Sequence, residues 1–413
     1  MDVSSIRKRF RLPDEPDAVE LRAFTHGLQP ATVPTMMEHF TEDWRRFGVD
    51  AWNAVPNHWR PDSGDSVGWW TLPTYLADEF VAPLLGAPAG TCILQPNVHW
   101  TVQCLLSAPE VIERGSGVVL SESAFPSVLH SVQQWTDLRS FSPTIVPPTA
   151  AGRTDREAVL RAIDDDTGMV ALSHVGFTSG ERLPDAYLQR LAERAHDHDA
   201  LLLLDGYHAA GSMPVDVTAL GCDLYVGGLL KEACGSSGNT YLYVREGLEL
   251  TPRLTGWFGD AAPFAFRTEP EPHPDVRRRF LGGTTSVAPM YHGVEGARLL
   301  LDVGLDRVRA HSRRLTSIAL ERADAAGLSV RSPTAPDARS AMVVIEVPDA
   351  ERMTAYLKRR HIYTDSRQNE VVRMAPFLWN TADEVHRTFD AIETGLETGR
   401  YREHRPAAHG PVT

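Results

Sequence analysis

The chain has 413 residues, of which 42% are hydrophobic and 23% charged, a composition typical of soluble globular proteins. Its formal net charge of −13 would be repelled by nucleic acids and anionic membranes, so neither is expected as its main partner. No run of about 18 apolar residues occurs, and no apolar segment follows the basic residues of MDVSSIRKRF, so we expect a cytoplasmic protein. The length exceeds a single small core and predicts a large domain with a smaller one.

The chain contains four cysteines, and their spacing argues against a structural metal site or a disulfide framework. They lie in different predicted elements, with no CxxC and no Cys/His spacing. We therefore expect buried, unreactive thiols and no metal ion. The four are Cys92, Cys104, Cys222 and Cys234.

The first 50 residues predict a loop followed by one helix. The loop is AFTHGLQP, residues 23–30. Over residues 35–48 apolar side chains recur at helical intervals, which predicts an amphipathic helix packed through its aromatic face and ending near Gly48. An aromatic-rich patch over residues 52–70 comes next, a pattern more typical of a core or a subunit interface than of a ligand platform.

Residues 75–198 alternate between predicted strands and helices. Residues 95–106 fit a strand–turn–helix corner, where the first amides of the helix can hold a phosphate. The alternation predicts parallel βαβ units in an open doubly wound sheet, with ligands at the carboxyl ends of the strands. The other predicted elements are helices at 75–85, 155–163 and 186–198, and strands at 118–121 and 169–174.

Residues 201–244 carry the groups from which the chemistry can be inferred. Four leucines run without a polar break into Asp205, which fits a fully buried strand of a parallel sheet. His208 follows on the same loop. Strands are predicted at 223–226 and 240–244, and Lys231 lies between them before a Gly/Ser-rich turn. An aspartate for a pyridinium nitrogen and a lysine for a Schiff base are what pyridoxal 5'-phosphate (PLP) requires of its protein.

This stretch also carries a family resemblance. The stretch reads D-x-x-H-A-A-G, then P-V-D, then G-C-D-x-x-V-G and a lysine before a glycine-rich turn. This pattern resembles the PLP-binding core of the class V aminotransferase group. Within that group the chain resembles kynureninase over nearly its whole length. The resemblance implies an α/β protein of PLP-dependent transferase fold type I. Such a protein has a large domain with a mostly parallel sheet between helices and a smaller C-terminal α+β domain.

The resemblance, with the element pattern, also implies a domain organisation. Residues 1–50 would contribute to the small domain and the active site, and residues 51–290 would form the large PLP-binding domain. Residues 291–400 would form the small domain, and 401–413 a disordered tail. The expected elements of the small domain are helices at 291–311, 315–326 and 350–360 and a strand at 341–347.

Several side chains match the cofactor-binding positions of the family. Lys231 would carry PLP, Asp205 would keep its ring nitrogen protonated, and His208 would contact the phosphate or the ring oxygen; these three are the expected catalytic residues. Phe125, in E-S-A-F-P-S-V, would stack on the ring. The remaining expected cofactor contacts are Leu94, Gln95, Ser127, Trp257 and Thr284.

The substrate implied by the resemblance is an amino acid. Arg373, within the closing motif of residues 364–381, matches the arginine that binds the α-carboxylate, a role suited to the planar guanidinium fork. His26 and Thr285 are the other expected substrate contacts. Thr284 and Thr285 would act across the interface of a homodimer whose active sites lie at that interface. His174 would either orient other groups of the site or only fill a polar pocket.

Four departures from the kynureninase pattern concern the groups nearest to substrate and phosphate. The residue before the lysine is Leu230 where the family has a tyrosine, and leucine can donate neither a proton nor a hydrogen bond. Val128 replaces an aspartate, Thr284 an asparagine and Asp260 a histidine. Because Asp205, Lys231 and Arg373 remain, this pattern indicates that cofactor binding is kept while the substrate or the reaction is altered.

The sequence therefore predicts a PLP-dependent enzyme that acts on an α-amino acid other than kynurenine, through an external aldimine and cleavage or elimination at Cβ or Cγ. A class V aminotransferase or epimerase is the alternative. A homologue that has lost catalysis and serves as a binding protein is a third possibility, disfavoured by Lys231 and Arg373. Cysteine desulfurases need a nucleophilic cysteine in the later half of the chain, and none follows Cys234.

Overall fold

A seven-stranded sheet forms the centre of the computed structural model, which describes residues 2–139 and 141–405. The strand order is β4-β10-β9-β8-β7-β5-β6, and β10 alone runs antiparallel to its two neighbours. This mixed, mostly parallel sheet confirms the predicted α/β class. The strands are β4 (Cys92–Gln95), β5 (Gly117–Ser121), β6 (Ser142–Val146), β7 (Thr167–Ser173), β8 (Leu201–Asp205), β9 (Leu224–Gly228) and β10 (Thr240–Val244).

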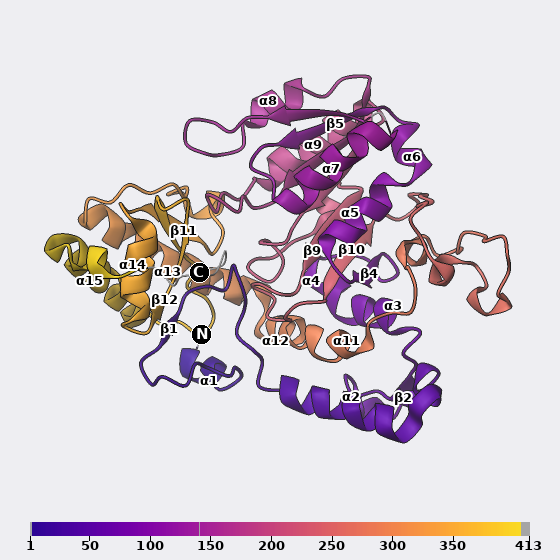
Figure 1. The fold of residues 1–413 in the computed structure, drawn as a ribbon, viewed down its shortest axis with the longest axis horizontal. Helices are drawn as coiled ribbons and strands as arrows, with labels where there is room; N and C mark the ends of the chain where they lie inside the picture. Colours follow the sequence, from indigo (N-terminus) through magenta and orange to yellow (C-terminus); the bar gives the residue numbers. More distant parts are fainter. Residues whose placement is uncertain (1, 140, 406–413) are drawn as a thin grey trace.

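The central strand β8 is buried on both faces. Leu201 and Leu203 join one hydrophobic cluster, and Leu202 and Leu204 join another, because successive side chains of a strand point to opposite faces. A continuous apolar run is what such a strand requires. Helices cover the sheet, as Figure 1 shows. They include α5 (Val98–Leu106), α7 (Pro126–Arg139), α8 (Arg156–Arg161), α9 (Asp185–Asp197) and the short α10 (Val217–Leu220).

The N-terminal helix α2 (Val33–Phe47) lies against α11 (Val287–Gly293) along one side of the molecule (Figure 1). A buried polar network joins them: the Tyr291 hydroxyl donates to Asp43 at 2.6 Å and accepts from the indole of Trp69 at 2.9 Å. The aromatic face predicted for α2 is only partly packed, because Trp44 is 63% exposed. The helix predicted at 75–85 is divided into α3 (Leu72–Leu76), a π-helical turn (Ala77–Val81) and α4 (Ala82–Leu84).

The C-terminal part of the chain forms a separate α+β unit beside the large sheet (Figure 1). Its sheet has the order β11-β14-β13, and the N-terminal strand β1 (Val19–Glu20) pairs with β12 (Ile362–Tyr363), so the N-terminal segment contributes to this unit. The unit has its own hydrophobic cluster. Its elements are β11 (Val343–Glu346), β13 (Asp365–Arg367), β14 (Val371–Met374), α13 (Leu305–Ala325), α14 (Ala350–Lys358) and α15 (Ala382–Thr398).

Helix boundaries near this unit differ from the sequence expectation. Residues 291–311 do not form one helix: α11 and α12 (Glu295–Val303) meet at Val294, and Gly304, at φ +88°, separates α12 from α13. A positive φ is accessible to glycine at low cost, so the chain turns there. Within the expected tail, a 3-10 turn (Arg400–Glu403) buries Tyr401 completely, while residues 406–413 lie outside the described part. The domain boundaries stay predictions.

None of the helices in the part of the chain that the structure describes is long and apolar enough to cross a membrane.

The loop of residues 23–30 packs directly on the lysine-bearing loop. The amide of Gly27 donates to the carbonyl of Leu230 at 3.1 Å. A methyl group on Gly27 would lie 2.3 Å from the carbonyl oxygen of Lys231 and 2.6 Å from Sγ of Cys234. Only glycine permits this close approach, and the N-terminal segment thereby fixes the position of Lys231.

A Gly27→Ala substitution should lower the free energy of unfolding by about 1–3 kcal/mol, because the added methyl group overpacks a site bounded by backbone. Chemical denaturation measures the change. Gly283→Ala is the matched control, since a methyl group there meets no atom within 4 Å. Equal stabilities of the two variants would contradict the close packing of the loop on Lys231.

Candidate active site

The carboxyl ends of β8 and β9 bring the predicted catalytic groups together. Asp205, the last residue of β8, is buried, and its Oδ1 accepts a hydrogen bond from the amide of Tyr207 at 2.9 Å. Burial raises the pKa of Asp205, whereas the Tyr207 amide and the charge of Lys231 lower it. A buried carboxylate held at a strand end is suited to pair with a cationic group of a ligand.

Lys231 lies next to His208 and between two aromatic rings. Its Nζ is 2.8 Å from Nε2 of His208, 4.5 Å from the ring centroid of Tyr207 and 5.3 Å from that of Phe125. Burial lowers the pKa of Lys231 to about 8, although the charges of Glu232 and Asp205 oppose this. A lysine with a lowered pKa is the form of amine that reacts with carbonyl groups near neutral pH.

Tyr207 reaches Lys231 because β9 ends in glycine. A Cβ atom on Gly228 would lie 2.4 Å from the hydroxyl oxygen of Tyr207, so no larger residue fits at the end of that strand. Burial raises the pKa of Tyr207 beyond its ordinary value, and its phenol stays protonated beside Lys231. Neither Tyr207 nor Gly228 was singled out by the sequence pattern.

Phe125 lies at the start of α7 with an open ring face. The side chain is 41% exposed and meets Phe177 edge-on at 5.5 Å between centroids. Ser127 is half-buried in the first turn of α7, where its carbonyl accepts from the hydroxyl of Ser131 at 2.6 Å. Val128, in contrast, is part of the hydrophobic core. Phe125 is thus available to stack on a ligand near Lys231.

Arg373 enters the site from β14 of the C-terminal unit. Its Nη2 donates to Oδ2 of Asp365 and its Nη1 to the carbonyl of Phe177, both at 2.7 Å. Its Nε has no partner among the described residues. The charge of Arg373 lowers the pKa of both Lys231 and His208, which places the guanidinium within electrostatic reach of the lysine. Each terminal nitrogen keeps a second N–H for an incoming carboxylate.

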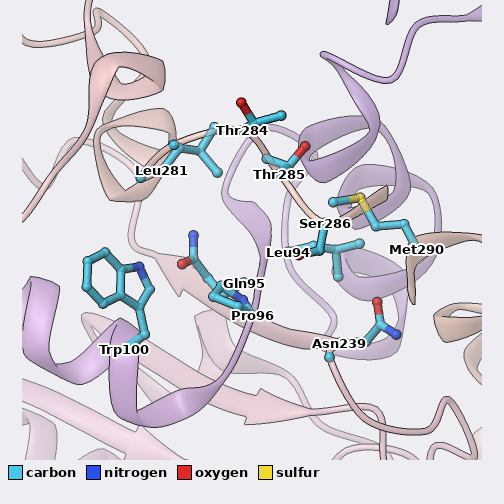
Figure 2. Close-up of a pocket in the computed structure, with 13 residues that line it drawn as sticks. Leu94, Gln95, Pro96, Trp100, Asn239, Leu281, Thr284, Thr285, Ser286 and Met290 are labelled. Carbon is cyan, nitrogen blue, oxygen red and sulfur yellow. The ribbon is translucent and has the colours of Figure 1, made fainter. Parts of the chain in front are cut away.

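A second group of predicted residues lines a separate cavity of about 250 Å³ (Figure 2). Gln95 points into it from the end of β4; it is 3% exposed, and neither Nε2 nor Oε1 has a hydrogen-bond partner in the described structure. Thr285 contributes a hydroxyl that is also buried and unpaired. Thr284 is exposed, and Leu94 contributes apolar wall. Lys231 does not line this cavity.

Three further residues lie outside both groups. Trp257 is 38% exposed and contacts Trp70 and Phe258. His26 is exposed on the loop next to Lys231, and partial burial lowers its pKa. His174 is buried beside Asp205, with Nδ1 2.9 Å from the hydroxyl of Tyr225, and burial lowers its pKa to about 3.

Glu232 and Asp365 are the charged residues that sequence reasoning missed. Glu232 is fully enclosed next to Lys231, and its Oε1 lies 3.5 Å from Nδ1 of His208. Asp365 holds both Arg373 and Arg367. The aspartate of the closing motif was visible in the sequence as the residue two before Arg367, but no pattern marked Glu232. No cluster of metal-ligating side chains occurs within residues 2–139 and 141–405.

Comparison with known proteins identifies the family. The model of the aminotransferase class-V family matches residues 99–369, more than half of the chain, and the chain therefore belongs to that family. An uncharacterized aminotransferase, YcbU of Bacillus subtilis (strain 168), is 28% identical over 77% of this chain and 82% of its own length.

Kynureninases are similar over nearly the whole chain. The enzyme of Geobacillus thermodenitrificans (strain NG80-2) is 24% identical over 96% of this chain and 92% of its own length. The enzyme of Pseudomonas fluorescens is 26% identical over 95% of this chain and 91% of its own length. Among solved structures, a cysteine desulfurase from Thermococcus onnurineus NA1 is 19% identical with a TM-score of 0.78, covering 96% of this chain and 98% of its own. The cystine C–S lyase C-DES, at 18% identity, also has a TM-score of 0.78 and covers 93% and 99%. These likenesses confirm fold type I.

PLP is the cofactor of this family, and the side chains around Lys231 fit it. Lys231 supplies an amine with a lowered pKa, Asp205 a buried carboxylate and Phe125 an open aromatic face. Buried polar atoms without partners, namely Nε of Arg373 and Oε2 of Glu232, border the same region and are the kind of atoms that a polar ligand satisfies. The predicted cofactor is therefore supported by the family and by the chemistry of the site.

Lys231 should lose its proton at a lower pH than an ordinary lysine does. In protein freed of cofactor, its labelling by acetic anhydride should be half-maximal near pH 8, because burial disfavours the ammonium form. Peptide mass spectrometry measures the labelling, with the exposed Lys358 as reference in the same sample. Labelling of Lys231 that rises only around its ordinary value of 10.5 would contradict the desolvated site.

Proposed function

We propose that this protein is a kynureninase-like PLP enzyme that acts on an α-amino acid other than kynurenine and breaks a bond at Cβ or Cγ, by cleavage or elimination. The observation that carries the proposal is that Lys231, Asp205 and Arg373 converge while Leu230 stands in the tyrosine position. When bound to Lys231, PLP supplies an electron sink for the α-carbon of an attached amino acid. All other tasks fall to side chains of the protein.

Each polar residue near Lys231 has a task that its surroundings support. Arg373, held by Asp365 at 2.7 Å, is oriented to take the α-carboxylate of the substrate. The amine of Lys231 can hold and return a proton, since its pKa of about 8 lies close to physiological pH. Asp205 is placed to keep a cationic ring nitrogen protonated. His208 presents Nε2 toward Lys231 as a hydrogen-bonding partner.

The departures from the kynureninase pattern support a different substrate or reaction. Leu230 presents an apolar side chain before Lys231, and its backbone carbonyl accepts a hydrogen bond from the amide of Gly27. Val128 is a core residue at 3% exposure. Asp260 is committed to its own loop, where Arg267 donates to it at 2.7 Å and holds its pKa down to about 2. None of these three can serve as an acid for a substrate carbonyl.

A class V aminotransferase or epimerase is the second candidate. The 28% identity to a Bacillus subtilis protein described as an uncharacterized aminotransferase favours it. Desulfuration of cysteine is disfavoured, although cysteine desulfurases share the fold, because the chemistry needs a reactive thiol. All four cysteines are buried, and burial raises the pKa of Cys92 and Cys104 to about 12.

Product identity separates the two candidates. Incubation of the holoenzyme with a panel of amino acids should release alanine or pyruvate from one of them. Kynurenine should yield anthranilate at least about 100-fold more slowly than the best substrate gives its product, because a proton donor is missing. Chromatography with mass detection identifies the products. A keto acid formed together with the pyridoxamine form of the cofactor would establish the alternative, and rapid formation of anthranilate would contradict the role given to Leu230.

The Lys231→Ala variant tests the attachment point in the same assay. It should lose turnover by at least about 1,000-fold, because both the covalent link and the proton-carrying amine are removed. Lys8→Ala is the matched control, since Lys8 is exposed near the N-terminus. Turnover retained by Lys231→Ala would refute the assignment.

The protein is further proposed to be a homodimer whose subunits complete each other's active sites. Support comes from the aromatic arm, residues 257–266, which belongs to the loop segment between β10 and α11 that projects beside the large sheet in Figure 1. Phe264 and Phe266 are 55% and 77% exposed and contact each other and Trp257. Large exposed aromatic side chains in contact are typical of an interface. Trp257, Thr284 and Thr285 would then serve the partner subunit.

Replacing both exposed phenylalanines of the aromatic arm by serine should shift the protein toward monomer and weaken PLP retention, because an interface core loses its aromatic anchors. Light scattering after size exclusion measures the mass. Val49→Ser, which removes one exposed apolar side chain elsewhere, is the control and should leave the mass unchanged. A wild-type protein that is monomeric with bound PLP would overturn the dimer.

A further inference from the structure

Glu232 is a buried carboxylate that the chemistry described above does not use. It follows Lys231 directly, is 2% exposed, and its Oε2 has no hydrogen-bond partner in the described structure. An ionisable side chain in such a position is costly unless its charge is balanced, so a residue of this type in the core of the site points to a specific role.

The carboxylate of Glu232 faces the imidazole of His208. Oε1 of Glu232 lies 3.5 Å from Nδ1 of His208, and the other nitrogen of the ring, Nε2, lies 2.8 Å from Nζ of Lys231. The imidazole thus bridges carboxylate and amine. Since only one nitrogen of a neutral imidazole carries a proton, the partner on one side decides what the other nitrogen can do.

Burial raises the pKa of Glu232, so its carboxylate stays ionised only beside positive charge, and Lys231 and Arg373 supply that charge. Burial disfavours the charged forms of both Glu232 and Lys231, whereas the attraction between the two charges favours them. Burial also keeps His208 neutral by lowering its pKa. The other titratable groups that sense the charge of Glu232 are Tyr207, Cys234 and Tyr241.

We propose that Glu232 is a positioning residue. Its carboxylate accepts a hydrogen bond from Nδ1–H of His208, which fixes Nε2 of His208 as an acceptor facing Lys231, and its negative charge stabilises the protonated lysine nitrogen. The inference rests on the attachment of the cofactor to Lys231 assumed in the proposed function. It does not depend on which amino acid is the substrate. Glu232 acts through His208 and through its charge, without contact to the substrate.

The pH titration of the visible absorption band of the holoenzyme tests the charge effect. Removing a nearby anion disfavours the protonated form, so Glu232→Gln should lower the apparent pKa of the band by about one unit, a tenfold change in the acid dissociation constant. Glu232→Asp keeps the charge and should stay within about 0.3 unit of the wild type. Glu246→Gln, at an exposed glutamate after β10, is the matched control and should not shift.

Three outcomes would overturn the proposal. One is a Glu232→Gln titration that coincides with the wild type, and another is an equal shift in Glu232→Asp, which would indicate packing rather than charge. The third comes from nitrogen NMR of the wild-type holoenzyme, with the ring of His208 assigned through His208→Gln: a proton on Nε2 and none on Nδ1 would exclude the proposed hydrogen bond. A wild-type protein that forms no visible band at all would instead refute the attachment at Lys231, and with it the proposed function.

Discussion

The candidate active site depends on one desolvated amine. Nζ of Lys231 lies 2.8 Å from His208, within electrostatic reach of Asp205 and Arg373, in surroundings that lower its pKa to about 8. Desolvation makes the amine reactive near neutral pH, and the surrounding carboxylates keep it from losing its proton altogether. Most of the architecture serves this balance: the parallel strands present Asp205 and the lysine loop at one edge of the sheet, and the loop at Gly27 closes over them.

The arrangement divides the task between parts of the chain that are distant in sequence. The large sheet supplies the amine and the buried acid, whereas the C-terminal unit supplies Arg373, whose backbone lies on β14 and whose guanidinium binds the carbonyl of Phe177 in the large part. This hydrogen bond joins the two parts at the site itself. Under the proposed function, a small shift of the C-terminal unit would therefore alter where Arg373 holds the substrate carboxylate before it altered the cofactor environment.

The sequence predicted the central strand because a run of leucines closed by Asp205 fits a strand buried on both faces. It could not predict that Thr240–Val244 runs antiparallel between two parallel neighbours, nor the break of the helix at Gly304, because both follow from tertiary packing. Glu232 carried no signal either, since a charged residue after a lysine usually lies in solvent. Family resemblance identified Gln95, but its separate cavity emerged only in three dimensions.

The central claim is that Lys231 carries the cofactor, and the chain makes it unusually easy to test because it has only three lysines, Lys8, Lys231 and Lys358. The holoenzyme should be reduced with borohydride, digested and examined by peptide mass spectrometry. The account predicts a phosphopyridoxyl group on the peptide containing Lys231 and none on Lys8 or Lys358, which are exposed. A modification spread over the two exposed lysines, or an unmodified Lys231 in a protein that holds PLP, would contradict it.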